Sequence, residues 1–358
     1  MSKLKIAILY GGRSVEHGVS INSARNIFEH IDTEKFEPVP IGITGRGIWY
    51  LTSSVGKNID QGSELCVRLN PQHPEFIASD GRRILPDVVF PVLHGTDGED
   101  GSIQGLLKAI DLPMIGTGVL GSSMSINKLV AKRMLKEAGL PVADFLFCNF
   151  GDPVFSFQQV RAKLGLPFMV KSANLGSSVG VSKVKNETEF AGAVQEGFRY
   201  DDCVLFEKFI DARELECAVL GNDPPEASLP GEIIISKNYE FYTFDAKYVD
   251  DQAVRIEVPA RIDATVAGKI QDLSIKAYQT LCGQDFARVD LFLTSEGNVF
   301  VNEINTIPGF TDSSMFPVMW KERGISFTEL ITRLIDLSLK RHAGTKRIER
   351  DFMSDLKF

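Results

Sequence analysis

Cysteine and positive charge are both scarce in this sequence. The five cysteines among its 358 residues include no C-x-x-C pair, so their spacing predicts neither a disulfide framework nor a zinc site and fits a reducing compartment. Lysine and arginine number 39 against 47 aspartates and glutamates, which gives a net charge of -8. A protein that binds nucleic-acid phosphates needs a basic stripe that this balance does not supply. We therefore expect small-molecule partners and no nucleic acid.

Long apolar runs and the glycine-rich nucleotide fingerprints are also missing. No apolar run approaches the ~18 residues that span a bilayer, and Met1 leads directly into a strand-like IAIL rather than into a targeting segment. We therefore expect a cytoplasmic protein without membrane contact. Neither G-x-x-x-x-G-K-S/T nor a G-x-G-x-x-G after a strand occurs, which argues against a P-loop enzyme and against a nicotinamide oxidoreductase.

What the sequence does contain is typical of a globular α/β protein. With 44% hydrophobic and 24% charged residues, the chain is long enough for two or three domains that share buried interfaces. Strand-like runs at 5–9, 36–43 and 87–93 alternate with segments of helical spacing, which include Ala24, Ile27, Phe28 and Ile31. Strands that alternate with helices predict a wound, mostly parallel sheet within residues 1–116.

The rest of the chain divides into two further units. A helix is expected from Ser125 to Gly139, where glycine favours a left-handed C-cap. A hairpin-like pair of strands follows, joined by the loop 173–178, and another strand is expected at 204–210. We assign residues 117–207 to a central unit, 208–345 to a third unit and 346–358 to a charged tail.

The segment ARVDLFLTSEGNVFVNEINTIPG at 287–309 predicts a hairpin with its charged residues on one face. Side chains two apart along a strand share a face, and a tight turn at 296–297 would set two pairs directly opposite each other. These pairs are Asp290 with Glu303, and Arg288 with Asn305. Facing carboxylates about 4.5 to 5.5 Å apart repel unless a cation lies between them. The predicted Mg²⁺ ligands are therefore Asp290, Glu303 and Asn305. Alternatively, Arg288 simply neutralises the carboxylates on a solvated strand face.

Two loops and one histidine carry side chains suited to a charged ligand. Lys171 precedes ANLGSSVG, where a cation and small residues allow backbone N–H groups to approach a phosphate; a flexible hairpin loop would look the same. Glu16 lies in GGRSVEHGVS between the first strand and helix, where it would bind an ammonium or complement the helix dipole. His94, after the third strand, would reach the same sheet edge, unless its role is structural.

In order, spacing and extent, these segments resemble the D-alanine:D-alanine ligases over nearly the whole chain. The motifs that carry the resemblance are GGRSVEH, LHGTDGEDGSIQG, NKLVAKRML, VKSANLGSSVG, FEKFI, DAKY, ARVD and NEINTIPG. The family implies a three-domain ATP-grasp fold, with ATP between the central and C-terminal domains and both D-alanines beneath its phosphates. It also implies a homodimer and two Mg²⁺ ions, for which Mn²⁺ can substitute.

By this resemblance, the nucleotide and metal sites draw on the two ATP-grasp domains. The ATP phosphates should contact Lys128, Lys171, Ser177 and Ser178. The adenine should lie along the strand formed by Glu207, Lys208, Phe209 and Ile210, and Glu214 should hold the ribose. The family's Mg²⁺ ligands fall on Asp290, Glu303 and Asn305, in agreement with the hairpin geometry.

The resemblance also implies a site for the two amino acids. Glu16 should bind the ammonium of the first D-alanine, near His94, and form a hydrogen-bonded trio with Ser177 and Tyr248. The residues near the second carboxylate should be Lys247 and Ser314, and the oxyanion donors should be Arg288 and the N–H of Gly309. The family usually has a second acidic residue near Glu16, and this chain has Gly18 at that position.

The resulting prediction is an ATP-dependent ligase that joins two D-alanines through a D-alanyl phosphate, for peptidoglycan precursor synthesis. Because acyl phosphates hydrolyse, the segment 241–251, which has no core periodicity, is expected to be a lid. The alternatives are a D-alanine:D-lactate or D-alanine:D-serine ligase of the same fold, and a catalytically inactive nucleotide-binding regulator. The DAKY sequence favours D-alanine, and the retained Arg288 and Asp290 argue against an inactive regulator.

Overall fold

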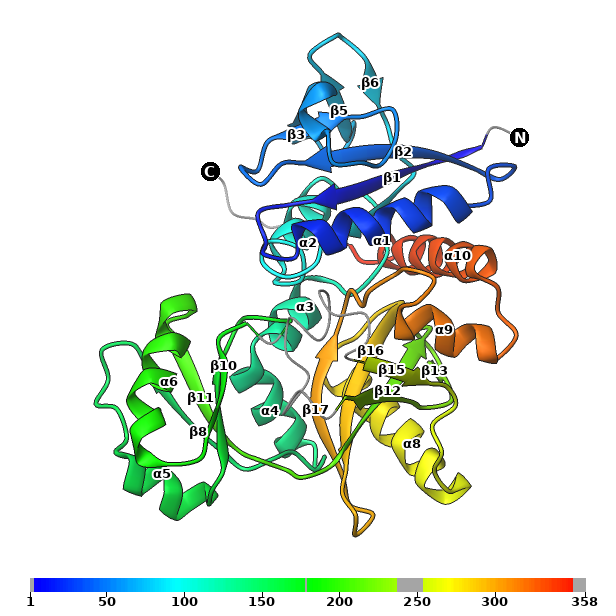
Figure 1. Ribbon diagram of the computed structural model, residues 1–358. Helices are drawn as coiled ribbons and strands as arrows, with labels where there is room; N and C mark the ends of the chain where they lie inside the picture. The colour runs from blue at the N-terminus through cyan, green and yellow to red at the C-terminus, as the bar shows by residue number, and fades with distance from the viewer. Residues whose placement is uncertain (1–2, 178, 237–253, 350–358) are drawn as a thin grey trace, which may run out of the picture.

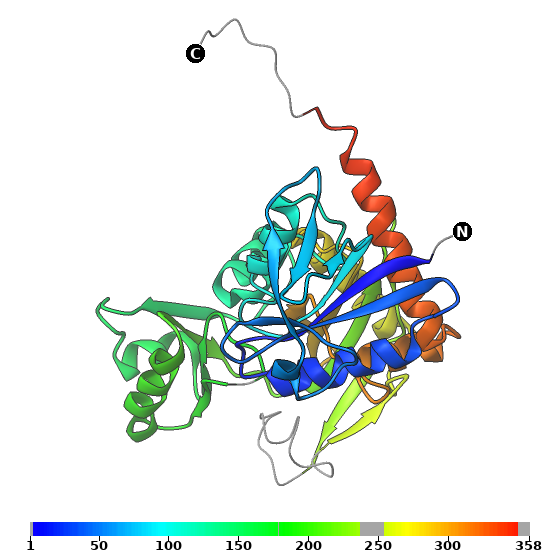
Figure 2. The same ribbon diagram turned by 90° about the horizontal axis from the view of Figure 1, so that it is seen from above.

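The computed structural model describes residues 3–177, 179–236 and 254–349, which build three sheets with their covering helices (Figure 1). The N-terminal sheet lies at the top of this view, the central sheet at the lower left and the C-terminal sheet at the lower right. Seen from above, the central sheet and its helices extend to one side of the other two (Figure 2). Within these ranges, none of the helices is both long and apolar enough to cross a membrane.

The N-terminal sheet is parallel only around its first strand. Its order in the described residues is β6-β5-β4-β3-β2-β1-β7, and β1 pairs in parallel with β2 and β7. The predicted parallel arrangement is confirmed for these three strands. The extension from β3 to β6 is antiparallel, because its strands follow one another without the crossover helix that parallel pairing needs. The strands are β1 (Leu4–Gly11), β2 (Phe36–Ile43), β3 (Trp49–Leu51), β4 (Ser63–Arg68), β5 (Glu75–Ala78), β6 (Arg83–Ile84) and β7 (Val88–Val92). The helical elements are α1 (His17–His30), η1 (Ile59–Gln61) and α2 (Ser102–Ala109).

Strand β1 contributes to two cores, one on each face of its sheet. Ile8 packs in a cluster that includes Ile27 of α1 and Leu334 of α10 (Phe327–Thr345), while Leu9 packs in a cluster that includes Leu107 of α2. This alternation follows from the two-residue period of a strand. The last helix of the chain therefore belongs to the N-terminal core, and Figures 1 and 2 show α10 beside β1 and α1.

The central sheet has the antiparallel order β10-β9-β11-β8 in the described chain. The predicted hairpin-like pair is confirmed as β9 and β10, which are joined by the loop after Ser172. Helices α5 and α6 contact the sheet, and their buried phenylalanine and valine side chains complete its core. The elements are β8 (Phe145–Asn149), α5 (Phe157–Leu164), β9 (Phe168–Ser172), β10 (Val181–Val184), α6 (Glu187–Tyr200) and β11 (Cys203–Lys208).

The helix predicted from Ser125 to Gly139 is two helices, so this prediction is wrong at its start. Asn127 interrupts it with extended backbone, φ -83° and ψ 101°, between α3 (Val119–Ile126) and α4 (Lys128–Glu137). The Asn127 side chain accepts a 2.9 Å hydrogen bond from the N–H of Val130, which is the role that favours asparagine at an N-cap. Gly139 adopts φ 75°, which confirms the left-handed end of the predicted helix.

The C-terminal sheet is antiparallel, with the order β15-β14-β12-β16-β17 and β13 beside β12 among the described residues. Helix α8 contacts β12, β13, β16 and β17, and α9 contacts β12. The elements are β12 (Arg213–Leu220), β13 (Glu226–Ala227), β14 (Gly231–Ile235), β15 (Val254–Glu257), α8 (Ala264–Thr280), β16 (Phe286–Leu293), β17 (Val299–Asn305) and α9 (Met315–Glu322). The domain limits 1–116, 117–207, 208–345 and 346–358 stay a prediction.

Asp285, at the start of β16, connects the N-terminal and C-terminal parts. Its fully buried carboxylate accepts hydrogen bonds from the backbone N–H of Gly116 at 2.9 Å, from Asn222 Nδ2 at 2.9 Å and from Arg341 Nη2 at 2.7 Å. Arg341 Nη2 also donates to the carbonyl of Met114 at 2.7 Å. One carboxylate thus holds the segment after β7, the loop after β12 and helix α10 together.

We expect Asp285→Ala to lower the free energy of unfolding by about 3–5 kcal/mol, the cost of leaving a buried ion-pair partner uncompensated. The variant would remove the acceptor of the Gly116 N–H and the charged partner of Arg341, whose guanidinium would keep its bonds to the carbonyls of Met114 and Gly116. Urea denaturation followed by circular dichroism measures the loss, and Asp272→Ala, at an exposed position of α8, is the matched control. Equal midpoints for the two variants would contradict this role.

Candidate active site

The β16–β17 hairpin has the predicted pairing at its charged end. Arg288 lies opposite Asn305, and Asp290 lies opposite Glu303. The predicted two-residue turn is wrong, because the hairpin closes between Thr294 and Asn298, with a 2.9 Å bond from Thr294 N–H to Asn298 O. A register shift after Asp290 places Leu291 opposite Val301, so one extra residue in β17 forms a bulge. The longer turn and the bulge offset each other, and the expected pairs result.

The facing carboxylates have cationic and amide neighbours. Arg288 binds Asp290 through two bonds, Nε to Oδ1 at 2.6 Å and Nη2 to Oδ2 at 2.7 Å. Asn305 Nδ2 donates to Asp290 Oδ2 at 3.0 Å, and Lys128 Nζ is 3.7 Å from Glu303 Oε2. Both expectations therefore hold in part: the carboxylates face each other, and Arg288 neutralises Asp290.

Glu216 adds a third carboxylate to this row, one that was not predicted from the sequence. It lies on β12 directly opposite Asp290, it is buried, and its Oε2 is 3.0 Å from Arg288 Nε. The sequence signal that could have indicated Glu216 is an acidic residue at an inward-facing position of the strand ELECAV. Arg288 therefore lies between two carboxylates, which orients its guanidinium plane.

The arrangement fits a hard divalent cation better than a soft one. Asp290, Glu303 and Asn305 present carboxylate and amide oxygens from two paired strands, which are the donors that Mg²⁺ prefers. Across the described ranges, no three His, Cys, Asp or Glu side chains form a cluster able to hold a metal by themselves. The candidate set is therefore two carboxylates with one amide.

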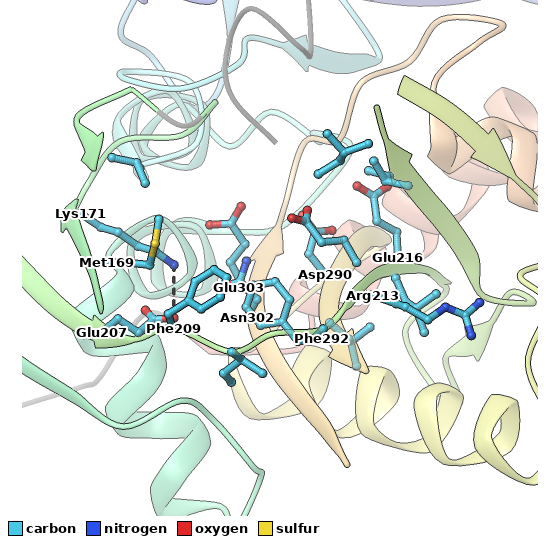
Figure 3. Close-up of a pocket in the computed structure, with 18 of the residues that line it drawn as sticks. Met169, Lys171, Glu207, Phe209, Arg213, Glu216, Asp290, Phe292, Asn302 and Glu303 are labelled. Atoms are coloured by element: carbon cyan, nitrogen blue, oxygen red, sulfur yellow. Dashed lines mark hydrogen bonds and ion pairs between the residues drawn. The ribbon is translucent and has the colours of Figure 1, made fainter. Parts of the chain in front are cut away.

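A cavity of about 390 Å³ lies between the central and C-terminal sheets (Figure 3). In this view Lys171 and Glu207 come from the central sheet, and Asp290 and Glu216 come from the C-terminal sheet across from them. The cavity brings together the predicted nucleotide residues Lys128, Lys171, Ser177, Glu207, Lys208, Phe209, Ile210 and Glu214, with Asp290 and Glu303. Ser178 lies outside the described residues.

Three charged side chains lie together beside this cavity, where Glu207 contacts both Lys171 and Lys132. Glu207 Oε1 is 3.2 Å from Lys171 Nζ, and Glu207 Oε2 is 3.1 Å from Lys132 Nζ. Burial would raise the pKa of Glu207, but the two lysines outweigh burial and hold that pKa below its ordinary value. Burial lowers the pKa of Lys132, against the attraction of Glu207. Lys132 was missed, although a lysine between the buried Ala131 and Leu135 of α4 was a visible signal.

A second cavity of about 630 Å³ adjoins the first, because Gly176, Ser177, Glu216, Ile233 and Glu303 line both. It brings together Glu16 and His94 from the N-terminal part with Arg288, Asn305, Gly309 and Ser314 from the C-terminal part. The predicted substrate residues in the described chain therefore surround one space. Lys247, Tyr248 and the segment 241–251 lie outside the described residues, so their predicted roles stay predictions.

Glu16 precedes α1 and forms one edge of the predicted trio. The Ser177 hydroxyl donates a hydrogen bond to Glu16 Oε1, and the N–H of Glu16 is held by Ser14 Oγ at 3.0 Å. Gly18 is exposed in the first turn of α1, and no atom of the described residues lies within 4 Å of the position that its Cβ would take. A larger side chain at this position would therefore begin without a steric clash with those residues.

We expect Gly18→Glu to stabilise the protein by roughly 0.5–1.5 kcal/mol. A glycine inside a helix costs up to about 1 kcal/mol relative to alanine, and an acidic side chain in the first turn adds about 0.3–1 kcal/mol. Helix α1 has no acidic residue there. Thermal unfolding of Gly18→Glu and Gly18→Ala separates the charge from the helix propensity, and a lower midpoint for the glutamate variant would contradict the expectation.

His94 holds the segment that carries Gly309. Its Nδ1 is 2.8 Å from the carbonyl of Ile307, so Nδ1 carries the proton, and Nε2 is 3.0 Å from Ser23 Oγ. Ser23 Oγ in turn accepts the N–H of Phe310 at 3.1 Å. Burial lowers the pKa of His94, which favours the neutral ring that this pattern requires. These hydrogen bonds give His94 a structural role, which was the alternative considered for it from the sequence.

Glu99 is a further buried carboxyl group beside the site, and it was not predicted from the sequence. Its Oε1 accepts the N–H of Ile307 and its Oε2 accepts the N–H of Gly95, each at 3.2 Å. Burial, reinforced by the charge of Glu16, raises the pKa of Glu99 to about 8. At neutral pH this group is therefore mostly protonated, and it fixes the segments before Gly309 and after His94 without adding a full charge.

Comparisons with known proteins match both halves of the chain to one family. The model of the D-ala D-ala ligase N-terminus matches residues 5–117, and that of the D-ala D-ala ligase C-terminus matches residues 134–336. D-alanine–D-alanine ligase A of Salmonella typhimurium strain LT2 is 45% identical over 98% of this chain and 99% of its own length. The protein of the same name from Escherichia coli K12 is 43% identical over 98% and 99%.

Two solved structures have the same overall arrangement. The D-alanine-D-alanine ligase from Coxiella burnetii matches with a TM-score of 0.86 and 38% identity, over 96% of this chain and 98% of that one. The VanG D-Ala:D-Ser ligase from Enterococcus faecalis matches with a TM-score of 0.85 and 35% identity, over 94% and 100%. These two ligases are named for different second amino acids, so the fold alone does not select between them.

Proposed function

This chain belongs to the D-alanine–D-alanine ligase family, and we propose that it joins two D-alanines with the hydrolysis of ATP to ADP and phosphate. The single observation that carries the proposal is the pair of adjoining cavities. One contains the lysines and carboxylates suited to a nucleotide and its metal, and the other contains a buried carboxylate and a guanidinium suited to an amino acid. Because residues such as Ser177 and Glu303 line both cavities, the phosphates would lie beside the amino acid.

The first half-reaction joins the contents of the two cavities. The carboxylate of the first D-alanine attacks the γ-phosphorus of ATP, and the P–O bond to ADP breaks to leave D-alanyl phosphate. Lys128 and Lys171, which line the first cavity, would contact the phosphates. Glu16 would bind the substrate ammonium, with its carboxylate oriented by the hydrogen bond from the Ser177 hydroxyl. Asp290, Glu303 and Asn305 would hold Mg²⁺, which supplies positive charge for the polyphosphate when bound.

The second half-reaction requires stabilisation of an oxyanion. The free amine of the second D-alanine attacks the acyl carbon, and the tetrahedral intermediate expels phosphate to leave the dipeptide. Its oxyanion needs donors that are already in place. Arg288 is oriented by its two bonds to Asp290, and the N–H of Gly309 is placed by the bonds of His94 and Ser23 to Ile307 and Phe310. These residues suit the role, and Ser314 lies in the same cavity for the second carboxylate.

The experiment that tests this function is ADP release measured with D-alanine alone, and then with D-serine or D-lactate added as the second substrate. We expect D-alanyl-D-alanine as the main product, with one ADP released per dipeptide. A main product with D-serine or D-lactate would establish the alternative ligases instead. Nucleotide binding without ADP release in any mixture would establish the inactive regulator.

The wider setting belongs to the same proposal and rests on the resemblance to the family. The dipeptide would serve peptidoglycan precursor synthesis in the cytoplasm, and the protein would act as a homodimer with ATP, Mg²⁺ and D-alanine as its ligands. Sedimentation of the purified protein tests the homodimer independently of the activity.

A further inference from the structure

Lys132 is a lysine buried beneath the nucleotide cavity, and the mechanism above does not use it. It lies one helical turn after Lys128 on α4, and its side chain is only 2% exposed. Lysine is almost never fully buried unless it is paired. Its partner is Glu207, whose side chain is also 2% exposed and whose Oε2 is 3.1 Å from Lys132 Nζ.

Glu207 is shared with a second lysine that has a different exposure. Lys171 Nζ is 3.2 Å from Glu207 Oε1, the contact marked in Figure 3, and the Lys171 side chain is 11% exposed. Lys171 is among the residues that line the cavity, and Lys132 is not among the described residues that do so. One carboxylate therefore joins a lysine that lines the cavity to a lysine buried behind the wall, and with all three groups ionised their net charge is +1.

Lys132 determines whether the ammonium of Lys171 can move away from Glu207 toward a phosphate. When Lys171 turns its ammonium toward a phosphate, it weakens its contact with Glu207. Without a second cation, that movement would leave a buried carboxylate uncompensated, which is strongly unfavourable. With Lys132 in place, Glu207 keeps a partner on its other oxygen throughout.

We propose that Lys132 is a positioning residue for ATP binding, which neutralises Glu207 and so leaves the charge of Lys171 available to the polyphosphate. The inference rests on the proposed ATP-dependent function. It assigns Lys132 no contact with the nucleotide. Its effect should therefore depend on the phosphates of the ligand and not on the adenosine.

We expect Lys132→Met to weaken ATP binding at least about tenfold, the order for one full charge acting over about 10 Å at an effective dielectric constant of about 20. Adenosine affinity should change less than twofold. Titration calorimetry with ATP and Mg²⁺ measures the first, and displacement of a fluorescent nucleotide measures the second. Lys136→Met, at an exposed position one turn further along α4, is the matched control and should leave both affinities unchanged.

A double variant separates this electrostatic role from packing. Lys132→Met combined with Glu207→Gln removes the buried charge pair together, so the net charge of +1 on Lys171 returns. We expect the ratio of ATP to adenosine affinity in the double variant to recover to within about threefold of the wild-type ratio. The double variant also serves if Lys132→Met alone fails to fold, because it strands no buried carboxylate.

The outcomes fall into three groups. A selective loss of ATP affinity in Lys132→Met supports the inference, as does a wild-type affinity ratio in the double variant where Lys132→Met alone does not fold. Unchanged ATP affinity in Lys132→Met, parallel loss of ATP and adenosine affinity, or no recovery in the double variant overturns it. Failure of the wild-type protein itself to bind ATP would instead overturn the proposed function.

Discussion

Asp290→Asn and Glu303→Gln are each expected to lower the turnover number for ligation by about 10²–10³-fold or more, the scale of losing an electrostatic stabiliser of the transition state. The two side chains face each other across β16 and β17. Each substitution removes one negative charge from the candidate Mg²⁺ ligands without changing the size of the side chain. The lost cation would otherwise balance phosphate charge as the acyl phosphate forms.

The two variants should differ in a second respect. Asp290 also binds Arg288 through two bonds, whereas Glu303 pairs with Lys128 at 3.7 Å. Asp290→Asn should therefore also disturb the guanidinium that serves the second half-reaction, and Glu303→Gln should not. Partitioning of the acyl phosphate between dipeptide and hydrolysis, measured in single-turnover reactions, separates these effects.

The matched control is Glu296→Gln at the exposed end of the same hairpin, where a charge is lost far from the cavity. The measurements are steady-state ADP release over a range of Mg²⁺ concentrations and thermal unfolding of each variant. The assignment of the metal ligands would be wrong if either site variant kept near wild-type turnover at saturating Mg²⁺ while remaining folded.

Local periodicity explains why the charged end of this hairpin could be predicted. Side chains alternate along any strand, so Asp290 and Glu303 had to share a face once the two strands paired. The closing turn and the bulge in β17 were not predictable in the same way, because each depends on how Leu291 and Val301 pack in the core beneath them. The predicted pairs were correct because the error in the turn and the bulge that was not predicted shift the strand register in opposite directions.

Contacts between segments that are far apart in the sequence could not be predicted from the sequence pattern. Lys132 and Glu207 are far apart in the sequence and meet because Leu129 of α4 packs with Leu205 of β11. Nothing in their local sequences specifies that packing. Glu99 was likewise visible in LHGTDGEDGS, but its bond to the N–H of Ile307 depends on how the N-terminal part docks on the C-terminal part. The resemblance to a family supplied the roles of residues that line the ligand sites, Glu207 among them, but not the contact of Glu207 with Lys132 or the role of Glu99.

The break at Asn127 is an intermediate case. Asparagine before a lysine-rich helix is a recognised N-cap signal, yet the apolar spacing of Leu129 and Leu135 continues smoothly enough from Ser125 to favour one helix. In the structure Asn127 ends one helix and caps the next. Its side chain also donates a hydrogen bond to Asn174 Oδ1 at 2.7 Å. That contact joins the start of α4 to the loop after β9, which is where Lys128 and Lys171 enter the same cavity.

Arg288→Lys is expected to lower the turnover number by about 10²–10³-fold, equivalent to about 2.7–4 kcal/mol of lost oxyanion stabilisation, while the KM for ATP changes less than about threefold. Lysine keeps the charge but cannot reproduce the planar fork that binds Asp290 at 2.6 and 2.7 Å and lies 3.0 Å from Glu216. The ammonium would settle between the two carboxylates as a point charge. The donor for the oxyanion would then be misplaced, whereas nucleotide contacts from Lys128 and Lys171 would remain.

The control for Arg288→Lys is Arg82→Lys, which alters an equally close arginine–aspartate pair, Arg82 with Asp80 at 2.6 Å, on the exposed surface of the N-terminal part. Exposed pairs contribute little to stability, so this variant should behave as the wild type. Pre-steady-state measurements give the decisive comparison, because formation of the acyl phosphate should be affected less than its conversion to dipeptide. An equal slowing of both half-reactions in Arg288→Lys would show that Arg288 acts through Asp290 and the metal ligands, and not as the donor to the tetrahedral oxyanion.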